Sequence, residues 1–598
     1  MYQYKKLLPL ALLLILTLPA IRPLFHSGFF TMHDDQQVVR LAELDRALMA
    51  GQFPVRWVGD LGFGYGYPLF NFYPPLVYYL GEAFHLLGFS YLFSIKLVFV
   101  AAFFSAALTM YHWARYHFGP WPAVIAALFY TYVPYHAVDA YVRGALAELF
   151  AFVWLPLILL SIDHLLSGNA PGRHFRGWSL VLSLSYAALM LTHNLIFLPF
   201  SLLLSFYLVI RLVFQPTALK QKLVSIITIS SSLFMGFFLT TFFWLPALAE
   251  KQFTLVNKIL LSEKYTFSLH YAQPWQLWNS LWGYGGSAPP GAIDGFTLKI
   301  GKLHLILATA SLLLAIASKL YKKRFHLISK TTTVLLTAYL LLLTSAWLTT
   351  SYSSFIWDHL QPLQYLQFPW RFLTFTALFS SFIVGSFYCQ LQKLFNDKLI
   401  LHSSFFIIVL LLFLPNLKLF QPQTYLNVND QYYLSDEFMK WKISGTSFEF
   451  VPYGVATHID PDKDITQLNI TKDQIATAPY SIISGQPQVS VVSNAPHQKQ
   501  LQISSDQTSI IQFNTFNFPI WRADIDNSPV SISDSNPLKL IQISVPPGQH
   551  QLSIKFTNTS TRTIANLTSL LFLLLLAGTM TLNQHQLTQL IYGRRARR

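Results

Sequence analysis

Long apolar runs separated by short polar stretches occupy most of the chain. The first, 7–25, is nearly all Leu, Ala, Ile and Pro, and comparable runs recur up to residue 415, with one more at 564–582. Runs of about 17–25 residues are long enough to cross the ~30 Å hydrocarbon core of a bilayer as helices. The pattern predicts a polytopic α-helical membrane protein with about twelve transmembrane helices.

Two segments of the first polar stretch, 26–90, have other patterns. Residues 36–51 carry apolar side chains on one helical face and charged ones, including Arg40 and Glu43, on the other. This amphipathic pattern predicts a helix lying on the membrane surface. Segment 68–88 is long enough to cross but contains Pro74, Pro75 and Glu82. Counting it as a span would turn every later basic loop outward, so we predict that 26–90 is one large external loop.

Near the C-terminus the pattern changes to short runs in which apolar and polar residues alternate. "QLQISSDQTSIIQF" (500–513) is typical, and Pro, Gly and Asn separate such runs. Period-two alternation predicts strands, here an all-β sandwich or jelly-roll domain outside the cytoplasm. We therefore expect a membrane domain (1–415), an extracytoplasmic β domain (416–562), and a final helix with a basic cytoplasmic tail (563–598).

Composition and charge fit this arrangement. The 598 residues are 53% hydrophobic and 11% charged, whereas soluble domains carry about 25% charged residues. The net charge of +15 does not indicate nucleic-acid binding, because the basic residues cluster in short loops between apolar runs, as in 319–330. The positive-inside rule then predicts a multi-pass protein of the plasma or inner membrane with both termini cytoplasmic. The single cysteine, Cys389, excludes an intrachain disulfide.

The same topology brings the unusual polar motifs to the outer side: "MHDDQQ" (32–37), "DAYVRGALAE" (139–148), "THN" (192–194) and "QFPWRF" (367–372). A carboxylate is costly inside a bilayer, so Asp34 and Asp35 must lie beyond the first helix. One interpretation is that they cap the following helix, since Asp is a favoured N-cap. The other is that one of them faces a cavity, because adjacent loop residues point in different directions.

The other motifs also allow two interpretations each. Arg143 and Glu148 would lie at the outer end of a helix, where Arg143 either snorkels beside its acidic neighbour or binds a phosphate. Arg371 lies among aromatic residues typical of a membrane interface and could equally contact headgroups or a lipid phosphate. His193, between two apolar runs, is more often an interface residue than a ligand.

Several stretches together resemble one known family. They are "HDDQQVVRLAELDRALMAGQFPVRW", "GYGYPLFNFYPPLVYYLG", "YVRGALAE", "LTHN", "QFPWRFL" and "FNFPIWRADIDN" (516–527). The chain is similar to bacterial membrane proteins catalogued as "6-pyruvoyl-tetrahydropterin synthase-related" and akin to YfhO-type proteins. The order of features also resembles the GT-C class of integral-membrane glycosyltransferases. The pterin label is misleading, because that synthase is a small soluble zinc enzyme.

The resemblance implies an inverting glycosyltransferase that moves a sugar from a polyprenyl-phosphate donor in the membrane to an extracytoplasmic glycan, lipid or protein. Asp34 or Asp35 would be its catalytic base or, in branches that use Mg²⁺ or Mn²⁺, the metal ligand. Arg143 and Arg371 would bind the donor phosphate, with Glu148, His193 and His33 around them. The alternatives are a non-catalytic membrane protein of envelope polysaccharide assembly and a transporter. Few charges lie inside the spans, which disfavours the transporter.

Overall fold

The computed structural model describes residues 2–167, 173–214, 217–261, 266–289, 291–321, 330–455, 468 and 470–581. Within these ranges, eight helices are long and apolar enough to cross a membrane. They are α1 (Tyr2–Ile21), α5 (Tyr91–Phe118), α8 (Leu146–Leu166), α10 (Asn194–Phe214), α11 (Leu219–Leu239), α18 (Leu373–Leu394), α19 (Lys398–Asn416) and α22 (Ser560–Thr581).

Three further apolar helices and α9 (Arg173–Thr192) complete the bundle. The three are α6 (Pro120–Thr131), α14 (Lys302–Tyr321) and α15 (Lys330–Leu348). The chain is thus the expected multi-pass membrane protein, although only eight of the about twelve predicted transmembrane helices have the length and hydropathy of a membrane span within the described ranges. The predicted basic tail and most of the basic loop 319–330 lie outside the described residues.

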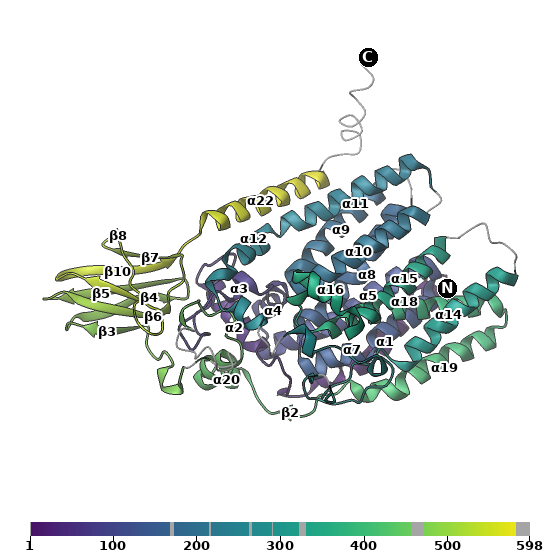
Figure 1. The fold of residues 1–598 in the computed structure, drawn as a ribbon, viewed down its shortest axis with the longest axis horizontal. Coiled ribbons are helices and arrows are strands. Elements are labelled where there is room, and N and C mark those ends of the chain that lie inside the picture. The colour runs from purple at the N-terminus through teal and green to yellow at the C-terminus, as the bar shows by residue number, and fades with distance from the viewer. Residues whose placement is uncertain are drawn as a thin grey trace, which may run out of the picture.

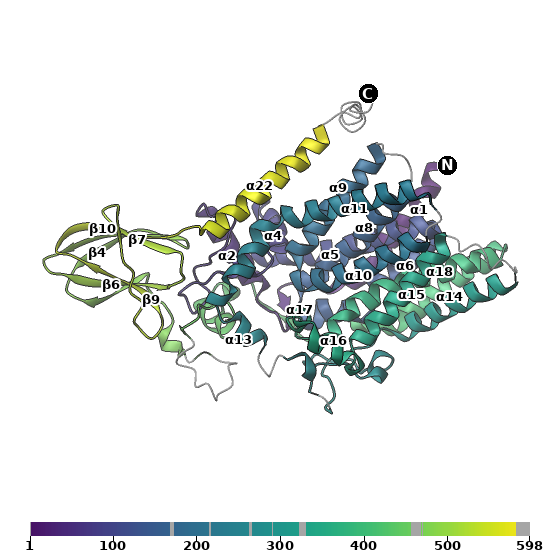
Figure 2. The same cartoon turned by 45° about the horizontal axis from the view of Figure 1, so that its top comes forward.

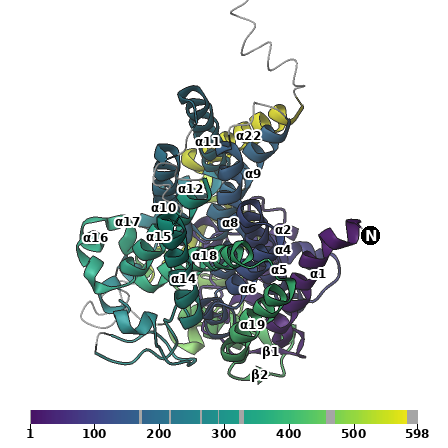
Figure 3. The same ribbon diagram turned by 90° about the vertical axis from the view of Figure 1, so that its right-hand side faces the viewer.

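The helices form a bundle with two central members. Viewed along the bundle, α8 and α18 lie in the middle, and α1, α11, α14, α19 and α22 lie around them (Figure 3). The apolar stretch of α18 is 94% buried, but that of α22 is only 22% buried. Since α22 is apolar and yet exposed, its outer face is suited to lipid rather than to water.

The first loop, 26–90, contains three short helices, α2 (Gln37–Met49), α3 (Leu69–Phe72) and α4 (Leu76–Leu86). Because α4 has only 11 residues, it is too short to cross a bilayer, in agreement with the prediction that 68–88 is not a span. The helix α2 forms as predicted, but the prediction that its charged side faces water at the membrane surface is wrong. Its apolar side contacts α4 and α5. On its charged side, both Arg40 and Glu43 are only 1% exposed.

The β domain follows α19 after a helical segment. That segment contains α20 (Asp430–Tyr433), η10 (Glu437–Ile443) and α21 (Ser444–Thr446) and packs near the first loop rather than in a sheet. Just before this segment, β2 (Tyr425–Leu426) pairs with β1 (Phe29–Phe30) of the first loop and so brings the chain back to that loop. The strands of the β domain itself lie within Tyr480–Phe556, at one end of the molecule (Figure 1).

Two antiparallel sheets make up this domain (Figure 2). One has the order β3 (Tyr480–Ser484), β6 (Ser509–Phe516), β9 (Leu540–Val545); the other has β4 (Gln488–Ala495), β5 (Gln498–Ser505), β10 (Gly548–Phe556), β7 (Trp521–Ile525), β8 (Ser528–Val530). Alternate residues such as Leu501 and Ile503 of β5, and Leu552 and Ile554 of β10, are buried. Period-two burial is typical of sheets that cover a common core, which confirms the predicted all-β domain.

Loops between the long helices carry several further short helices. They are α7 (Pro134–Ala137), η2 (Val138–Arg143), α12 (Thr241–Glu250), α13 (Val256–Leu260), α16 (Ser354–His359), α17 (Gln361–Gln364) and η8 (Pro369–Phe372). Of these, α12 and α13 lie toward the β domain (Figures 1 and 2). Residues of the predicted polar motifs lie close together, since Asp34 contacts Arg143 through its backbone and Glu148 contacts both Arg143 and Arg371.

Candidate functional site

The segment after α1 lies against the corner between η2 and α8. The backbone N–H of Asp34 donates to the Arg143 carbonyl at 2.8 Å, and that of His33 donates to the Val142 carbonyl at 3.1 Å. Gly144 makes this approach feasible, because a Cβ there would meet the Met32 sulfur at 2.2 Å. Its φ of +65° is also one that side-chain-bearing residues rarely adopt. Asp34 is thus fixed by its own backbone beside Arg143.

Arg143 is the centre of a buried cluster. Its Nη1 donates to Glu148 Oε2 at 2.9 Å and to the Tyr135 hydroxyl at 3.2 Å, and it forms an ion pair with Asp139. The guanidinium carbon also lies 4.8 Å from the ring centre of Trp370. Arg143 is therefore held by the protein through Nη1, and its side chain is only 9% exposed, so it does not snorkel toward water.

Arg371 approaches the same carboxylate from η8 but is much less satisfied. Its Nε lies 3.8 Å from Glu148 Oε2, which is too long for a hydrogen bond. Nε and Nη1 are both buried, and neither has a hydrogen-bond acceptor in the described part of the chain. Buried charged donors are normally paired, and among the described residues only the Glu148 carboxylate forms an ion pair with this arginine, at a distance too long for a hydrogen bond.

Glu148 joins the two arginines. Besides Arg143 and Arg371, its carboxylate accepts hydrogen bonds from the Tyr135 hydroxyl at 2.7 Å and from Thr374 Oγ1 at 3.3 Å. The carboxylate is completely buried. It provides fixed negative charge that partly neutralises the arginine pair, a role that needs no contact with a substrate.

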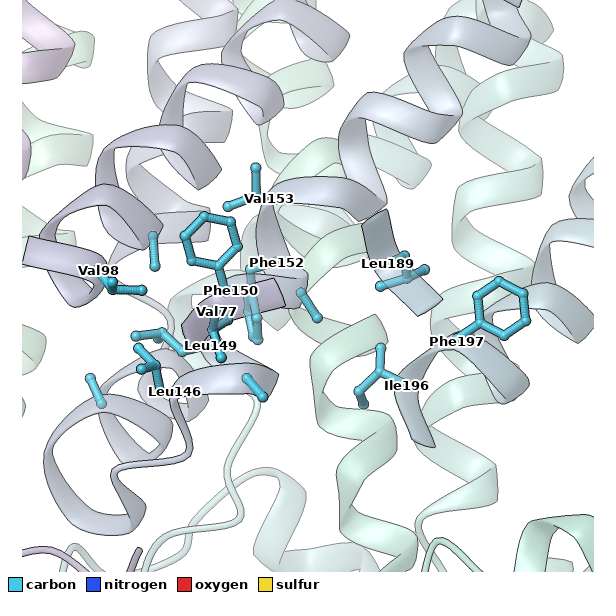
Figure 4. Packing of buried hydrophobic residues seen from close by; sticks show 14 of the residues in the cluster. Val77, Val98, Leu146, Leu149, Phe150, Phe152, Val153, Leu189, Ile196 and Phe197 are labelled. Atoms are coloured by element: carbon cyan, nitrogen blue, oxygen red, sulfur yellow. The ribbon is translucent and has the colours of Figure 1, made fainter. Parts of the chain in front are cut away.

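His193 lies in the turn between α9 and α10, close enough to interact electrostatically with Glu148 and both arginines. Its Nδ1 accepts a hydrogen bond from the Ile196 backbone at 3.1 Å. Burial, only partly offset by the Glu148 carboxylate, lowers the pKa of His193 to about 3, so the imidazole is neutral at pH 7. Apolar residues pack on the helices around this turn: Figure 4 shows Leu189 of α9, Ile196 and Phe197 of α10, and Leu146, Leu149 and Phe150 of α8.

The two adjacent acids have different partners. Asp34 interacts electrostatically with Arg143 and Arg371. Asp35 instead forms a 2.6 Å ion pair with Lys442 of η10, and its side chain remains 25% exposed. The N-cap of α2 is Gln36, and no side chain caps the helix. The interpretation that an Asp caps this helix is therefore wrong.

His33 lies at the rim. It is exposed, and its Nε2 is 2.9 Å from the Tyr284 carbonyl, to which it donates a hydrogen bond. The loop before α14 thereby reaches the segment that carries Asp34. Of the predicted site residues, the structure brings Asp34, Arg143, Glu148, His193 and Arg371 to one corner, with His33 at its edge and Asp35 directed elsewhere.

A divalent-cation site would need several oxygen ligands at one point. Among the residues that the structure describes, no three His, Cys, Asp or Glu side chains come together as metal ligands. Asp34 and Asp35 have different partners, and Asp139 and Glu148 are already paired with Arg143. This donor set does not fit Mg²⁺ or Mn²⁺, so no step of the reaction proposed for this site runs through a metal.

Three residues of the corner were not predicted. Asp139 precedes Arg143 by four positions, a spacing that brings side chains together on a helix and that could have identified it. Tyr135 follows a proline, and Thr374 lies inside an apolar run. Neither has a sequence signal, because only the packing of α7 and α18 against α8 brings them to Glu148.

No family model matches the chain, and no curated protein is similar to it. The solved structures similar to it include an archaeal oligosaccharyltransferase, AglB from Archaeoglobus fulgidus, in complex with an inhibitory peptide and a dolichol-phosphate. The two share 14% identity and a TM-score of 0.45, over 72% of this chain and 57% of that one.

Two others are ArnT from Cupriavidus metallidurans bound to undecaprenyl phosphate and the arabinofuranosyltransferase AftD from Mycobacteria. ArnT shares 13% identity and a TM-score of 0.38, over 67% of this chain and 62% of ArnT. AftD shares 13% identity and a TM-score of 0.44, over 72% of this chain and 28% of AftD. This chain thus spans less than two thirds of the length of each of the three proteins to which it is similar.

Proposed function

We propose that the protein is an inverting membrane glycosyltransferase of the GT-C type and a member of the pterin-synthase-related, YfhO-like family. It transfers a sugar from a polyprenyl-phosphate donor to an extracytoplasmic acceptor. The observation that carries this proposal is Arg371, a buried arginine with two unpaired N–H donors in the described part of the chain. It lies in electrostatic reach of Asp34, whose backbone is hydrogen-bonded to Arg143. The transfer requires a site that binds the departing phosphate and a base that activates the attacking hydroxyl, and the two must lie side by side.

In the proposed reaction, Asp34 removes the proton of the acceptor hydroxyl as its oxygen attacks the anomeric carbon. The bond between that carbon and the phosphate oxygen breaks on the opposite face, so the anomeric configuration inverts. The electron pair of the broken bond leaves with the polyprenyl phosphate. General-base catalysis of this kind contributes about 10²–10⁴-fold.

The arginines have different roles in this reaction. Arg371 binds the phosphate oxygens with Nε and Nη1, because neither has an acceptor among the described residues. Arg143 is held by Glu148, Tyr135 and Asp139 and adds positive charge without changing partners. Preorganised charge at the position where negative charge develops stabilises the transition state.

The orientation in the membrane belongs to the same proposal. The corner and the β domain (416–562) face the extracytoplasmic side, and both termini face the cytoplasm. The donor then enters from the surrounding lipid, and the acceptor enters from the aqueous side.

A donor screen tests the function. Purified protein in lipid nanodiscs is mixed with a panel of undecaprenyl-phosphate sugars and candidate envelope acceptors, and transfer of labelled sugar is measured. We expect Asp34→Asn to lower transfer by at least about 100-fold, the low end for loss of a general base. Asp35→Asn is the matched control, and it should retain activity within about fivefold because Asp35 pairs with an exposed lysine.

Binding of undecaprenyl phosphate without sugar separates the two roles. Asp34→Asn should bind this lipid as the wild type does, because Asp34 acts on the acceptor. A wild type that transfers no sugar from any donor, or an Asp34→Asn variant with full activity, contradicts the proposal. Equal losses in both Asp variants would contradict the assignment of the base.

A further inference from the structure

Glu449, a residue distant in sequence from the predicted site, connects to the first loop. Its carboxylate accepts a hydrogen bond from Ser447 Oγ, at 3.3 Å to Oε1 and 3.4 Å to Oε2. Ser447 Oγ in turn accepts one from Arg40 Nη2 at 3.1 Å. The segment after α21 is therefore attached to α2 by a buried arginine.

From Arg40 the hydrogen bonds continue to the corner between η2 and α8. Arg40 Nη1 donates to the Tyr78 hydroxyl at 3.5 Å, and that hydroxyl donates to Gln37 Oε1 at 2.7 Å. Gln37 Nε2 donates to the Gly144 carbonyl at 2.9 Å. The residue before Gly144 provides the carbonyl that accepts from the Asp34 backbone. One continuous network therefore connects the segment after α21 with the segment that carries Asp34.

The network has a buried layer and an outer layer. Gln37, Arg40, Ser447 and Tyr78 are each at most 3% exposed. Asp34, Tyr73 and Glu449 each keep part of their surface exposed. Tyr73 belongs to the same assembly, because the Arg40 guanidinium carbon lies 4.0 Å from the centre of its ring. Three partly exposed residues thus adjoin a buried, hydrogen-bonded base.

Charge couples these three side chains. Burial raises the pKa of Glu449, Arg40 opposes this effect, and the negative charge of Asp34 adds to it. Burial also raises the pKa of Tyr73, again with Arg40 opposing and Asp34 adding. Asp34 is therefore within electrostatic reach of both Glu449 and Tyr73. Arg40 keeps a buried Nε that has no acceptor in the described part of the chain.

We propose that Asp34, Tyr73 and Glu449 form a subsite for a neutral, hydroxyl-rich acceptor, a sugar ring, with Arg40 as the positioning residue beneath it. This inference rests on the proposed function, because Asp34 would act on one of the acceptor's hydroxyls. Glu449 accepts a hydrogen bond from a second hydroxyl and so fixes the orientation of the ring.

The chemistry of the subsite favours this class of acceptor. Carboxylates accept hydrogen bonds from hydroxyl groups, and the Tyr73 hydroxyl can donate or accept. A sugar ring offers several hydroxyls at short spacing and carries no charge. An anionic acceptor would be repelled by Asp34 and Glu449.

The test uses Glu449→Gln, which keeps the shape of the side chain and removes its charge. With the donor and acceptor found in the transfer screen, we expect the KM for the acceptor to rise at least tenfold and the KM for the donor to stay within twofold. Tyr73→Phe should act in the same direction. Glu437→Gln is the matched control, because Glu437 is 61% exposed and pairs with Lys472 on the surface, and it should change neither value.

A binding measurement separates this inference from the proposed function. Saturation-transfer NMR of the detergent-solubilised full chain with free glucose, galactose and mannose needs no transfer reaction. We expect a signal from at least one sugar with the wild type and with Glu437→Gln, and at least a fivefold weaker signal with Glu449→Gln. If Glu449→Gln does not fold, Tyr73→Phe decides alone.

Equal sugar binding by Glu449→Gln and the wild type overturns the subsite, and so does a wild type that binds none of the three sugars. An increase in the donor KM instead of the acceptor KM also overturns it. Sugar binding that depends on Glu449 in a protein without transferase activity would refute the proposed function and leave the subsite standing.

Discussion

At the scale of single residues, the stability of the site depends on one carboxylate that neutralises two arginines. Glu148 is the one carboxylate that contacts both Arg143 and Arg371 in the described part of the chain. Glu148→Gln would leave two buried guanidinium groups with less compensating charge. Breaking a buried pair typically costs about 3–5 kcal/mol, so we expect a large fall in the thermal unfolding midpoint in detergent.

The control for this variant is Glu437→Gln, which removes an exposed carboxylate. Exposed pairs contribute about 0–1 kcal/mol, so the unfolding midpoint should barely change. Equal effects of the two substitutions would mean that Glu148 does not neutralise the arginines.

Arg371 gives a second prediction at this scale. Arg371→Gln removes the charge and both free donors, and hydrogen bonds to charged groups are worth about 1.5–3 kcal/mol each. We expect affinity for undecaprenyl phosphate to fall by at least about tenfold, since about 1.4 kcal/mol is a factor of ten. Arg371→Lys should recover only part of it, because lysine lacks the planar fork. Lipid binding measured by native mass spectrometry checks this, and unchanged affinity in Arg371→Gln contradicts the phosphate role.

At the scale of elements, the junction of η2 with α8 positions the segment that carries Asp34. Gly144→Ala would add a Cβ where the Met32 sulfur already lies, at a φ that strains any side chain. We expect a loss of at least about 1 kcal/mol in stability together with a loss of transfer, because the Asp34 backbone would be displaced. Gly177→Ala is the control: Gly177 lies in α9 with open space around its Cβ position.

In Gly177→Ala, alanine has the higher helix propensity, so stability should be unchanged or rise by up to about 1 kcal/mol. Activity assays and thermal unfolding of both variants give the comparison. A Gly144→Ala variant with normal transfer would show that the corner does not hold Asp34 in place.

The elements also mark the limit of prediction from sequence. The apolar runs predict the membrane helices because the bilayer requires about 20 apolar residues per crossing. The amphipathic pattern of 36–51 predicts α2 itself but not its surroundings. Arg40 and Glu43 look solvent-facing in sequence, yet both are buried, and the distant residue Ser447 accepts a hydrogen bond from Arg40 on that side. No local pattern records such a long-range contact.

The same reasoning explains the site. The distribution of basic residues among the loops predicts that Asp34, Arg143 and Arg371 lie on the same side of the membrane, so their proximity could be expected from the sequence. The distinction between Asp34 and Asp35 could not be, because it depends on Lys442 of η10. Glu449 lies in a range that the alternating pattern assigns to the β domain, and only the folded chain brings it beside the first loop.

At the scale of the whole molecule, one buried network attaches the last helix to the rest of the protein. Arg562 of α22 donates to Glu250 of α12 at 2.6 Å, and Asn71 of the first loop donates to the same carboxylate at 3.0 Å. Arg56 donates to Asn71 at 3.0 Å and to Asn566 of α22 at 3.0 Å. The β domain ends four residues before α22 begins, so this network also fixes where that domain is attached.

A double-mutant cycle on Glu250 and Arg562 measures this attachment. Arg562→Met leaves a buried carboxylate without its main partner, which should cost about 3–5 kcal/mol. Glu250→Gln leaves Arg562 unpaired and should cost a similar amount. Replacing both removes the two charges together, so the double variant should be more stable than the sum of the single losses predicts, with a coupling of about 0.5–3 kcal/mol.

Limited proteolysis between the β domain and α22 measures how firmly α22 is attached to the rest of the protein. Each single variant should be cut faster than the wild type, and the double variant should be cut at an intermediate rate. Additive losses, with no coupling between the two positions, would mean that α22 is held by its apolar face alone. The buried pair would then contribute nothing specific to the position of the β domain beside the first loop.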